Sequence, residues 1–167
     1  FNAPHAPMHA TEDDLKLYAH IKDEKRRTYA AMVHRLDVNV GRIVNELKNQ
    51  EIGDNTIVVF FSDNGGPTNH NASINAPLRG SKGILLEGGI RVPFTMTWPN
   101  GIKAGTTFDQ PISSLDLTPT FVELAGGKIT DKDNLDGVNI LPFIKGDESS
   151  RPHDNMKWRF TISASIR

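Results

Sequence analysis

Three short stretches of this 167-residue chain carry side chains that could do chemistry. They contain His5 among prolines, Asp63 and Asn64 before two glycines, and Lys82 between glycines. Carboxylate and carboxamide oxygens suit Ca²⁺ or Mg²⁺, and the chain has no cysteine to hold a softer metal. An ammonium beside glycines could hold an oxyanion as a point charge. The residue types are therefore those of a hard-cation site and an anion site.

Each stretch also has a plainer structural interpretation. Asp63 to Gly66 is good turn chemistry, although residues 67–77 lack the alternating apolar pattern that a returning hairpin strand would need. Lys82 could be a surface lysine in a flexible loop, and the spacing of a Walker motif is missing. A lone histidine is usually structural or exposed, and the same interpretation is given to His9, His20, His34, His70 and His153. The residues alone leave both interpretations open.

A strand over residues 56–61 is expected to position Asp63 and Asn64. Its β-branched and aromatic residues show no polar alternation, which is typical of a strand buried on both faces of a parallel sheet. Ligands bind beyond the carboxyl ends of such strands, where Asp63 and Asn64 would emerge. A second strand is predicted over residues 94–98.

Helical patterns surround these strands. Thr11 with the acids after it indicates a helix start, and Gly126 with Gly127 ends a later helix that begins near Ser113. Residues 128–153 are interpreted as a long surface connection with a short apolar piece at 138–144. A core-facing helix is predicted from apolar residues spaced by threes and fours, namely Tyr29, Met32, Val33, Leu36, Val40, Ile43, Val44 and Leu47. The order of elements is α/β.

Composition excludes several kinds of protein. The chain has 19 basic and 20 acidic residues, and its one basic triplet, Lys25 to Arg27, is interpreted as a solvated helix face and not as a nucleic-acid footprint. No apolar run approaches the length of a membrane span, and disulfides are impossible without cysteine. One domain fits the length, no signal peptide is visible, and both ends are expected to be cut from a longer protein.

Several motifs in a fixed order resemble the type I sulfatases of the alkaline phosphatase superfamily. The first half of the resemblance consists of residues 2–7, 61–66, 78–83 and 87–93. Residues 116–120, 135–138 and 151–153 continue it. The resemblance implies an α/β fold, an alkaline phosphatase-like α/β/α sandwich with a mostly parallel central sheet, here incomplete. It also implies a periplasmic or extracellular protein that acts on a sulfated small molecule or glycan, with no nucleic-acid partner.

The resemblance gives roles to the candidate site residues. Asp63 and Asn64 would ligate Ca²⁺, and Lys82 would contact the sulfate. His5 would lie beside the sulfate and the leaving-group oxygen, as catalytic and substrate-binding residue together with Lys82. The reaction implied is hydrolysis of a sulfate ester by a formylglycine hydrate, with the charge offset by the metal and Lys82 and with His5 as candidate proton donor.

One part of the family pattern is missing. Sulfatases mature formylglycine from a Cys or Ser in Cys/Ser-x-Pro-x-Arg, and here Ser150 and Pro152 are followed by Asp154 where Arg is required. The nucleophile and the paired early acids are expected upstream, so residues 1–167 are interpreted as a partial catalytic domain without its C-terminal subdomain, inactive alone. Two alternatives stay open, a phosphoesterase or phosphonate hydrolase of the same superfamily and a non-catalytic anion- or glycan-binding relative.

The polar loop at residues 67–77 has two possible roles. Its amide and imidazole side chains could contact a sugar, or the loop could simply be solvated, which is the more common case. The side chains in question are Asn69, His70, Asn71 and Asn75.

Overall fold

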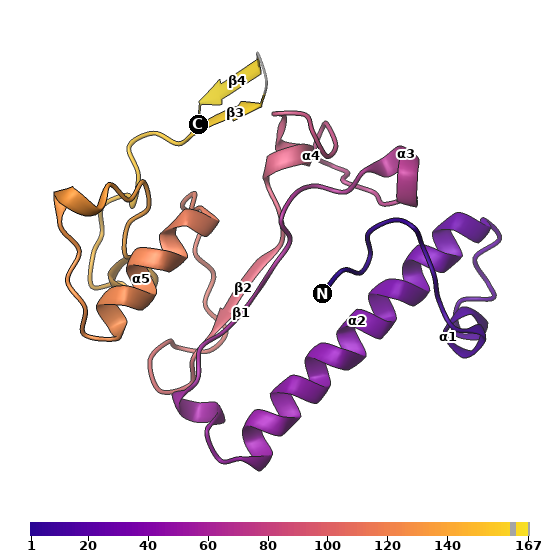
Figure 1. The fold of residues 1–167 in the computed structure, drawn as a ribbon, viewed down its shortest axis with the longest axis horizontal. Coiled ribbons are helices and arrows are strands. Elements are labelled where there is room, and N and C mark those ends of the chain that lie inside the picture. Colours follow the sequence, from indigo (N-terminus) through magenta and orange to yellow (C-terminus); the bar gives the residue numbers. More distant parts are fainter. Residues whose placement is uncertain (161–162, 167) are drawn as a thin grey trace.

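The computed structural model describes residues 1–160 and 163–166 as a mixture of helices and short strands (Figure 1). The helices are α1 (Glu12–Leu17), α2 (Glu24–Asn49), α3 (Thr68–Asn71), α4 (Glu87–Ile90), α5 (Leu117–Leu124) and α6 (Leu141–Lys145). Short 3₁₀ turns cover Gly53–Asn55, Ser114–Asp116 and Asp131–Asp133. The strands are β1 (Val58–Phe61), β2 (Phe94–Thr97), β3 (Lys157–Phe160) and β4 (Ser163–Ile166). None of the helices in this part of the chain is long and apolar enough to cross a membrane.

Helices α1 and α2 form an N-terminal corner that a buried carboxylate holds. The predicted cap is confirmed, since Thr11 Oγ1 accepts a hydrogen bond from the Asp14 backbone N–H. Asp14 is 2% exposed and accepts two hydrogen bonds from the guanidinium of Arg35 on α2, at 2.9 and 2.6 Å. This bidentate geometry fixes the direction in which α2 leaves the corner.

The apolar face predicted for α2 exists but does not face a closed core. Met32 is buried, whereas Val33 and Ile43 are 37% and 49% exposed. Most of this face lines a large cavity between α2 and β1. The expectation of a core-facing helix was therefore wrong for the described residues, because the packing partner of this face is not among them.

Strand β1 pairs with β2 in antiparallel register, from Val58 opposite Thr97 to Phe61 opposite Phe94. Figure 1 shows the pair as one extended ribbon beside α2. The α/β class is confirmed, but neither strand pair in the described residues is parallel, since β3 and β4 are also antiparallel. The expectation of burial on both faces was wrong here, because Phe60 and Phe61 are 40% and 38% exposed.

The C-terminal part folds around α5 and α6. Residues 128–153, which were predicted to form a surface connection, contain the predicted apolar piece at residues 138–144. This piece forms helix α6, and Ile140 and Leu141 are buried at its start. Asp116, wholly buried, accepts hydrogen bonds from the backbone of Ser113 and Val138 and lies 2.8 Å from His153 Nε2. The hairpin of β3 and β4 follows this part, and residues 161, 162 and 167 lie outside the described residues.

Candidate active site

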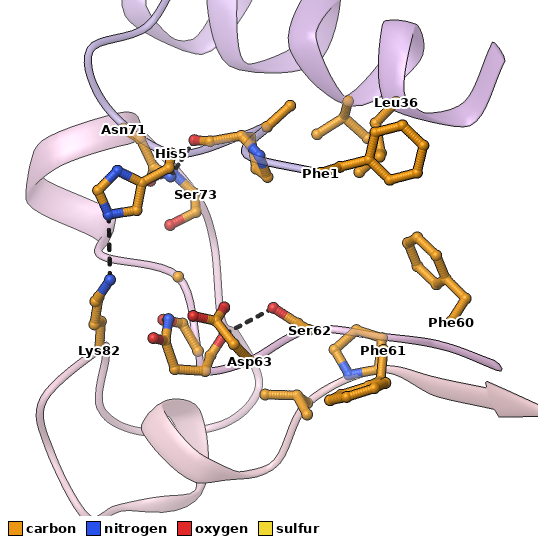
Figure 2. A pocket seen from close by; sticks show the side chains of 18 of the residues that line it. Phe1, His5, Leu36, Phe60, Phe61, Ser62, Asp63, Asn71, Ser73 and Lys82 are labelled. Carbon is orange, nitrogen blue, oxygen red and sulfur yellow. Dashed lines mark hydrogen bonds between the residues drawn. The ribbon is translucent and has the colours of Figure 1, made fainter. Parts of the chain in front are cut away.

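A cavity of about 1090 Å³ brings the four candidate residues together. His5, Asp63, Asn64 and Lys82 all line it, although they lie up to 77 positions apart in the sequence. Figure 2 shows His5 and Lys82 facing each other, with Asp63 to the right of Lys82. The same cavity extends toward an apolar wall that includes Phe60. A charged, polar end and an apolar end therefore share one space.

His5 and Lys82 form a direct pair whose hydrogen-bond direction can be assigned. His5 Nδ1 lies 2.7 Å from the Ala6 carbonyl oxygen, so Nδ1 must carry the proton and donate it. In the neutral ring Nε2 is then an acceptor, and it lies 3.3 Å from Lys82 Nζ, which donates to it. Both side chains are exposed to the cavity, so this pair presents an ammonium and an imidazole to any anion that enters.

Asp63 and Asn64 present free oxygens at the end of β1. No hydrogen-bond donor within the described ranges reaches the Asp63 carboxylate, which is exposed. Asn64 uses its amide nitrogen to donate to the Gly65 carbonyl at 3.0 Å, which leaves its side-chain oxygen available. Two adjacent hard oxygens fit the ligand chemistry of Ca²⁺. They form part of a shell, because no group of three or more His, Asp or Glu residues gathers in the part of the chain that the structure describes.

Backbone contacts position the loop that carries these oxygens. The Ser62 N–H donates to the Pro93 carbonyl at 3.2 Å, and the Gly65 N–H donates to the Gly89 carbonyl at 2.9 Å. A Cβ at Gly65 would collide with the carbonyl of Gly88. The loop therefore lies directly against the backbone of α4, and only glycine fits at position 65.

Helix α4 also holds the lysine loop. The Gly88 N–H donates to the Arg79 carbonyl at 2.6 Å, three residues before Lys82. Arg91 and Glu87, four residues apart, form an ion pair with 3.6 Å between nitrogen and oxygen. The glycines of this segment thus link the two candidate loops through main-chain contacts.

Sequence reasoning missed the structural use of the polar loop and of the basic triplet. Asn71 is 3% exposed and donates to the Pro4 carbonyl at 3.2 Å, beside His5. Lys25 donates to the Asn69 carbonyl at 2.9 Å, and Arg26 donates to the Ala72 carbonyl at 2.8 Å. Lys25 is exposed, as a solvated helix face requires, but the prediction of the basic triplet left out these hydrogen bonds to the loop carbonyls. No local spacing could reveal partners more than 40 residues away.

The chain was compared with known protein families and with curated proteins. The sequence profile of the sulfatase family matches residues 1–127. A curated relative described as the uncharacterized sulfatase YdeN of Escherichia coli (strain K12) is 32% identical over 159 residues, which are 95% of this chain and 28% of that protein. The chain thus spans less than a third of the length of that relative.

Several solved structures also match this chain over most of its length and over less than half of their own. Ps i-CgsB in complex with k-i-k-neocarrahexaose matches 99% of this chain and 37% of its own with a TM-score of 0.92 and 41% identity. The phosphonate monoester hydrolase of Silicibacter pomeroyi matches 79% of this chain and 24% of its own with a TM-score of 0.64 and 25% identity. The cavity residues of the present chain all lie within residues 1–127, the range that the sulfatase profile matches.

Proposed function

This chain belongs to the sulfatase family, and from that membership we propose that the protein containing it hydrolyses sulfate esters. Residues 1–167 would form the later part of its catalytic domain, with the nucleophile in a preceding segment. The observation that carries the proposal is the His5 and Lys82 pair at 3.3 Å on the cavity that Asp63 and Asn64 also line. A cation and an imidazole that both face one cavity suit a tetrahedral anion.

Lys82 would bind the ester by its charge. Its ammonium donates to His5 Nε2 in the structure, and an entering sulfuryl oxygen is a stronger acceptor than a neutral imidazole. Transfer of that hydrogen bond to the substrate would release Nε2. The exposed His5 would then take up a proton from solvent at Nε2 and donate it to the departing alcohol oxygen, while the Ala6 carbonyl keeps Nδ1 in place.

Asp63 and Asn64 would hold Ca²⁺ through their free side-chain oxygens. When bound, the metal would offset negative charge on the sulfuryl oxygens, and a formylglycine from outside this chain would supply the nucleophile. In this chain the role of both residues is to present oxygens from a loop fixed by main-chain hydrogen bonds. The role in metal binding and the need for formylglycine are part of the proposal.

The proposed substrate is a sulfate ester of a carbohydrate, with simple aryl or alkyl sulfates as the alternative. Support comes from the 41% identical structure, which was solved with an oligosaccharide in place.

The proposed compartment is the periplasm or the exterior. Fractionation of the producing cells would test the compartment, and recovery in the cytoplasm would contradict it.

Substitution of Lys82 by Ala tests the site in the protein as naturally encoded. We expect kcat/KM for an aryl sulfate to fall by about 100-fold or more, the scale seen when one charge-stabilising donor is lost. Lys128→Ala is a matched control, since Lys128 is exposed and does not line the cavity. An unchanged rate in Lys82→Ala would show that Lys82 is not a catalytic residue.

A phosphonate or phosphate esterase is the second candidate. The match to a phosphonate monoester hydrolase favours it, because an ammonium and an imidazole on one cavity serve either tetrahedral anion. Matched aryl sulfate, aryl phosphate and phosphonate ester assays separate the two, and faster phosphorus-ester turnover would favour the second.

The upstream reading frame gives the sharpest check on catalysis. We expect it to encode Cys/Ser-x-Pro-x-Arg. An intact frame without that motif would exclude the formylglycine mechanism and favour a non-catalytic anion- or glycan-binding relative.

A further inference from the structure

Asn75 joins the two loops that carry the candidate site. Its Oδ1 accepts a hydrogen bond from the Gly66 N–H at 2.9 Å, and its Nδ2 donates to the Gly66 carbonyl at 2.8 Å. The same Nδ2 donates to the Gly80 carbonyl at 3.0 Å. One carboxamide thus satisfies both backbone groups of one residue and reaches across to a second loop.

The two loops held in this way are those of the metal and anion candidates. Gly66 lies two residues after Asn64, and Gly80 lies two residues before Lys82. The Lys82 backbone N–H also points to the Gly66 carbonyl, but at 3.4 Å this is a long contact. The short hydrogen bonds between the loops at this point are therefore those of Asn75.

The segment that carries Asn75 is itself anchored. The Arg26 guanidinium binds the Ala72 carbonyl at 2.8 Å, and the Asn71 amide binds the Pro4 carbonyl at 3.2 Å. These contacts tie the segment to α2 and to the backbone beside His5. The backbone that carries Asn75 is therefore held in place on both of these sides.

No other side chain of similar size reproduces the three bonds. Aspartate keeps the shape but has no N–H, so both donations would be lost and a negative charge would face two carbonyls. Alanine loses all three bonds. Gly66 lies against the Ser73 side chain, and a Cβ at this position would collide with it.

We propose that Asn75 is a positioning residue that sets the distance between the Asp63–Asn64 loop and Lys82, and through it the anion site. Asn75 also lines the cavity, but its amide N–H groups are used on the Gly66 and Gly80 carbonyls and it makes no hydrogen bond to the His5 or Lys82 side chain among the described residues, so we expect its effect on an anion to act through the backbone of the two loops. The proposal rests on the proposed function for its substrate, but the positioning itself can be measured by binding of inorganic sulfate.

A double-mutant cycle in the protein as naturally encoded tests this role. We expect Asn75→Ala to lower kcat/KM and to weaken binding of inorganic sulfate, each by about 10- to 100-fold, the range found when a group that orients a site residue is removed. In the Lys82→Ala background the same substitution should cost less than about threefold, because the residue it positions is gone. Asn75→Asp should behave like Asn75→Ala.

The controls separate positioning from general stability. Asn69→Ala removes the same kind of side chain from the same loop, but Asn69 is exposed, so its effect should be within about twofold of the parent. Equal losses from Asn75→Ala with and without Lys82 would overturn the proposal, and so would unfolding of both Asn75 variants at the assay temperature. Loss of sulfate binding without any sulfate hydrolysis in the parent would support the positioning role and contradict the proposed function instead.

Discussion

Two aspartates, Asp63 after β1 and Asp116 before α5, differ in how their carboxylates are used. Asp116 is wholly buried, and its oxygens receive the Ser113 N–H at 2.7 Å, the Val138 N–H at 3.0 Å and His153. Asp63 is exposed to the cavity and receives no donor from the described residues. The first carboxylate joins three segments of the chain, whereas the second is left for something outside it.

This difference separates a structural acid from the acid that we propose to be functional. Burying a carboxylate is costly unless donors surround it, so a satisfied, buried carboxylate contributes to stability. An exposed carboxylate fixed on a rigid loop contributes little to stability and is available to a ligand. Removal of Asp116 should therefore affect folding, and removal of Asp63 should affect activity.

The largest effect is expected for Asp116→Ala. The substitution leaves two backbone N–H groups and His153 without their acceptor, so the free energy of unfolding should fall by about 3 kcal/mol. Denaturant unfolding of the purified protein would measure it. Asp147→Ala, an exposed acid in the same part of the chain, is the control and should change little. Equal stability of the two variants would contradict the structural role given to Asp116 in the comparison with Asp63.

Asp63→Ala should have the opposite profile. We expect kcat/KM to fall by about 100-fold, because a ligand of the proposed metal is lost, while the free energy of unfolding changes by less than about 0.5 kcal/mol. Steady-state assays and unfolding curves on the same preparation would show both. A destabilised but fully active variant would mean that Asp63 is a structural acid after all.

The contribution of the Asp14 carboxylate to stability can be measured from its pH dependence. Hydrogen bonds from the Arg35 guanidinium, and then from Thr11, hold the pKa of Asp14 below its ordinary value of 3.8. A lowered folded-state pKa contributes stability that is present above 3.8 and is lost as the pH falls through the lower value. Stability measured from pH 7 to pH 3 should fall less steeply below pH 4 in Asp14→Asn. An unchanged slope would contradict the assignment.

The smallest effect is expected for Lys16→Ala. Lys16 and Asp13 form an ion pair at 3.0 Å with both side chains mostly exposed, at 72% and 89%. Exposed pairs of this kind contribute between about 0 and 1 kcal/mol, so the variant should unfold within error of the parent in 0.15 M salt. A larger loss of stability would mean that an exposed acid such as Asp13 can also have a structural role.

Elements with a strong local pattern could be predicted from the sequence. The cap at Thr11, the long amphipathic helix and the strand before Asp63 depend on neighbouring residues, and each is present. Antiparallel pairing of this strand could not be predicted, because an unbroken apolar run looks the same in either direction. Exposure of Phe60 depends on which chain covers it, and local sequence does not specify that.

Some residues of the candidate site could likewise be predicted from the sequence, and others could not. Collinear motifs selected His5, Asp63, Asn64 and Lys82, and the structure places all four on one cavity. Asn75 was interpreted as a sugar contact or a solvated residue, because an asparagine in a polar loop has no local pattern that names its partners. Its bonds to Gly66 and Gly80 depend on how two separate loops meet.

The tight main-chain contact at Gly65 has a consequence for directed evolution of new specificity. At this position a single added methyl group meets the Gly88 carbonyl, so a random library across the loop would lose most of its members to misfolding. The neighbouring positions Asn69, His70 and Ile74 are exposed and can vary with little penalty. Of these three residues Ile74 also lines the cavity, so a library at Ile74 would change the apolar lining of the cavity without replacing His5, Asp63, Asn64 or Lys82.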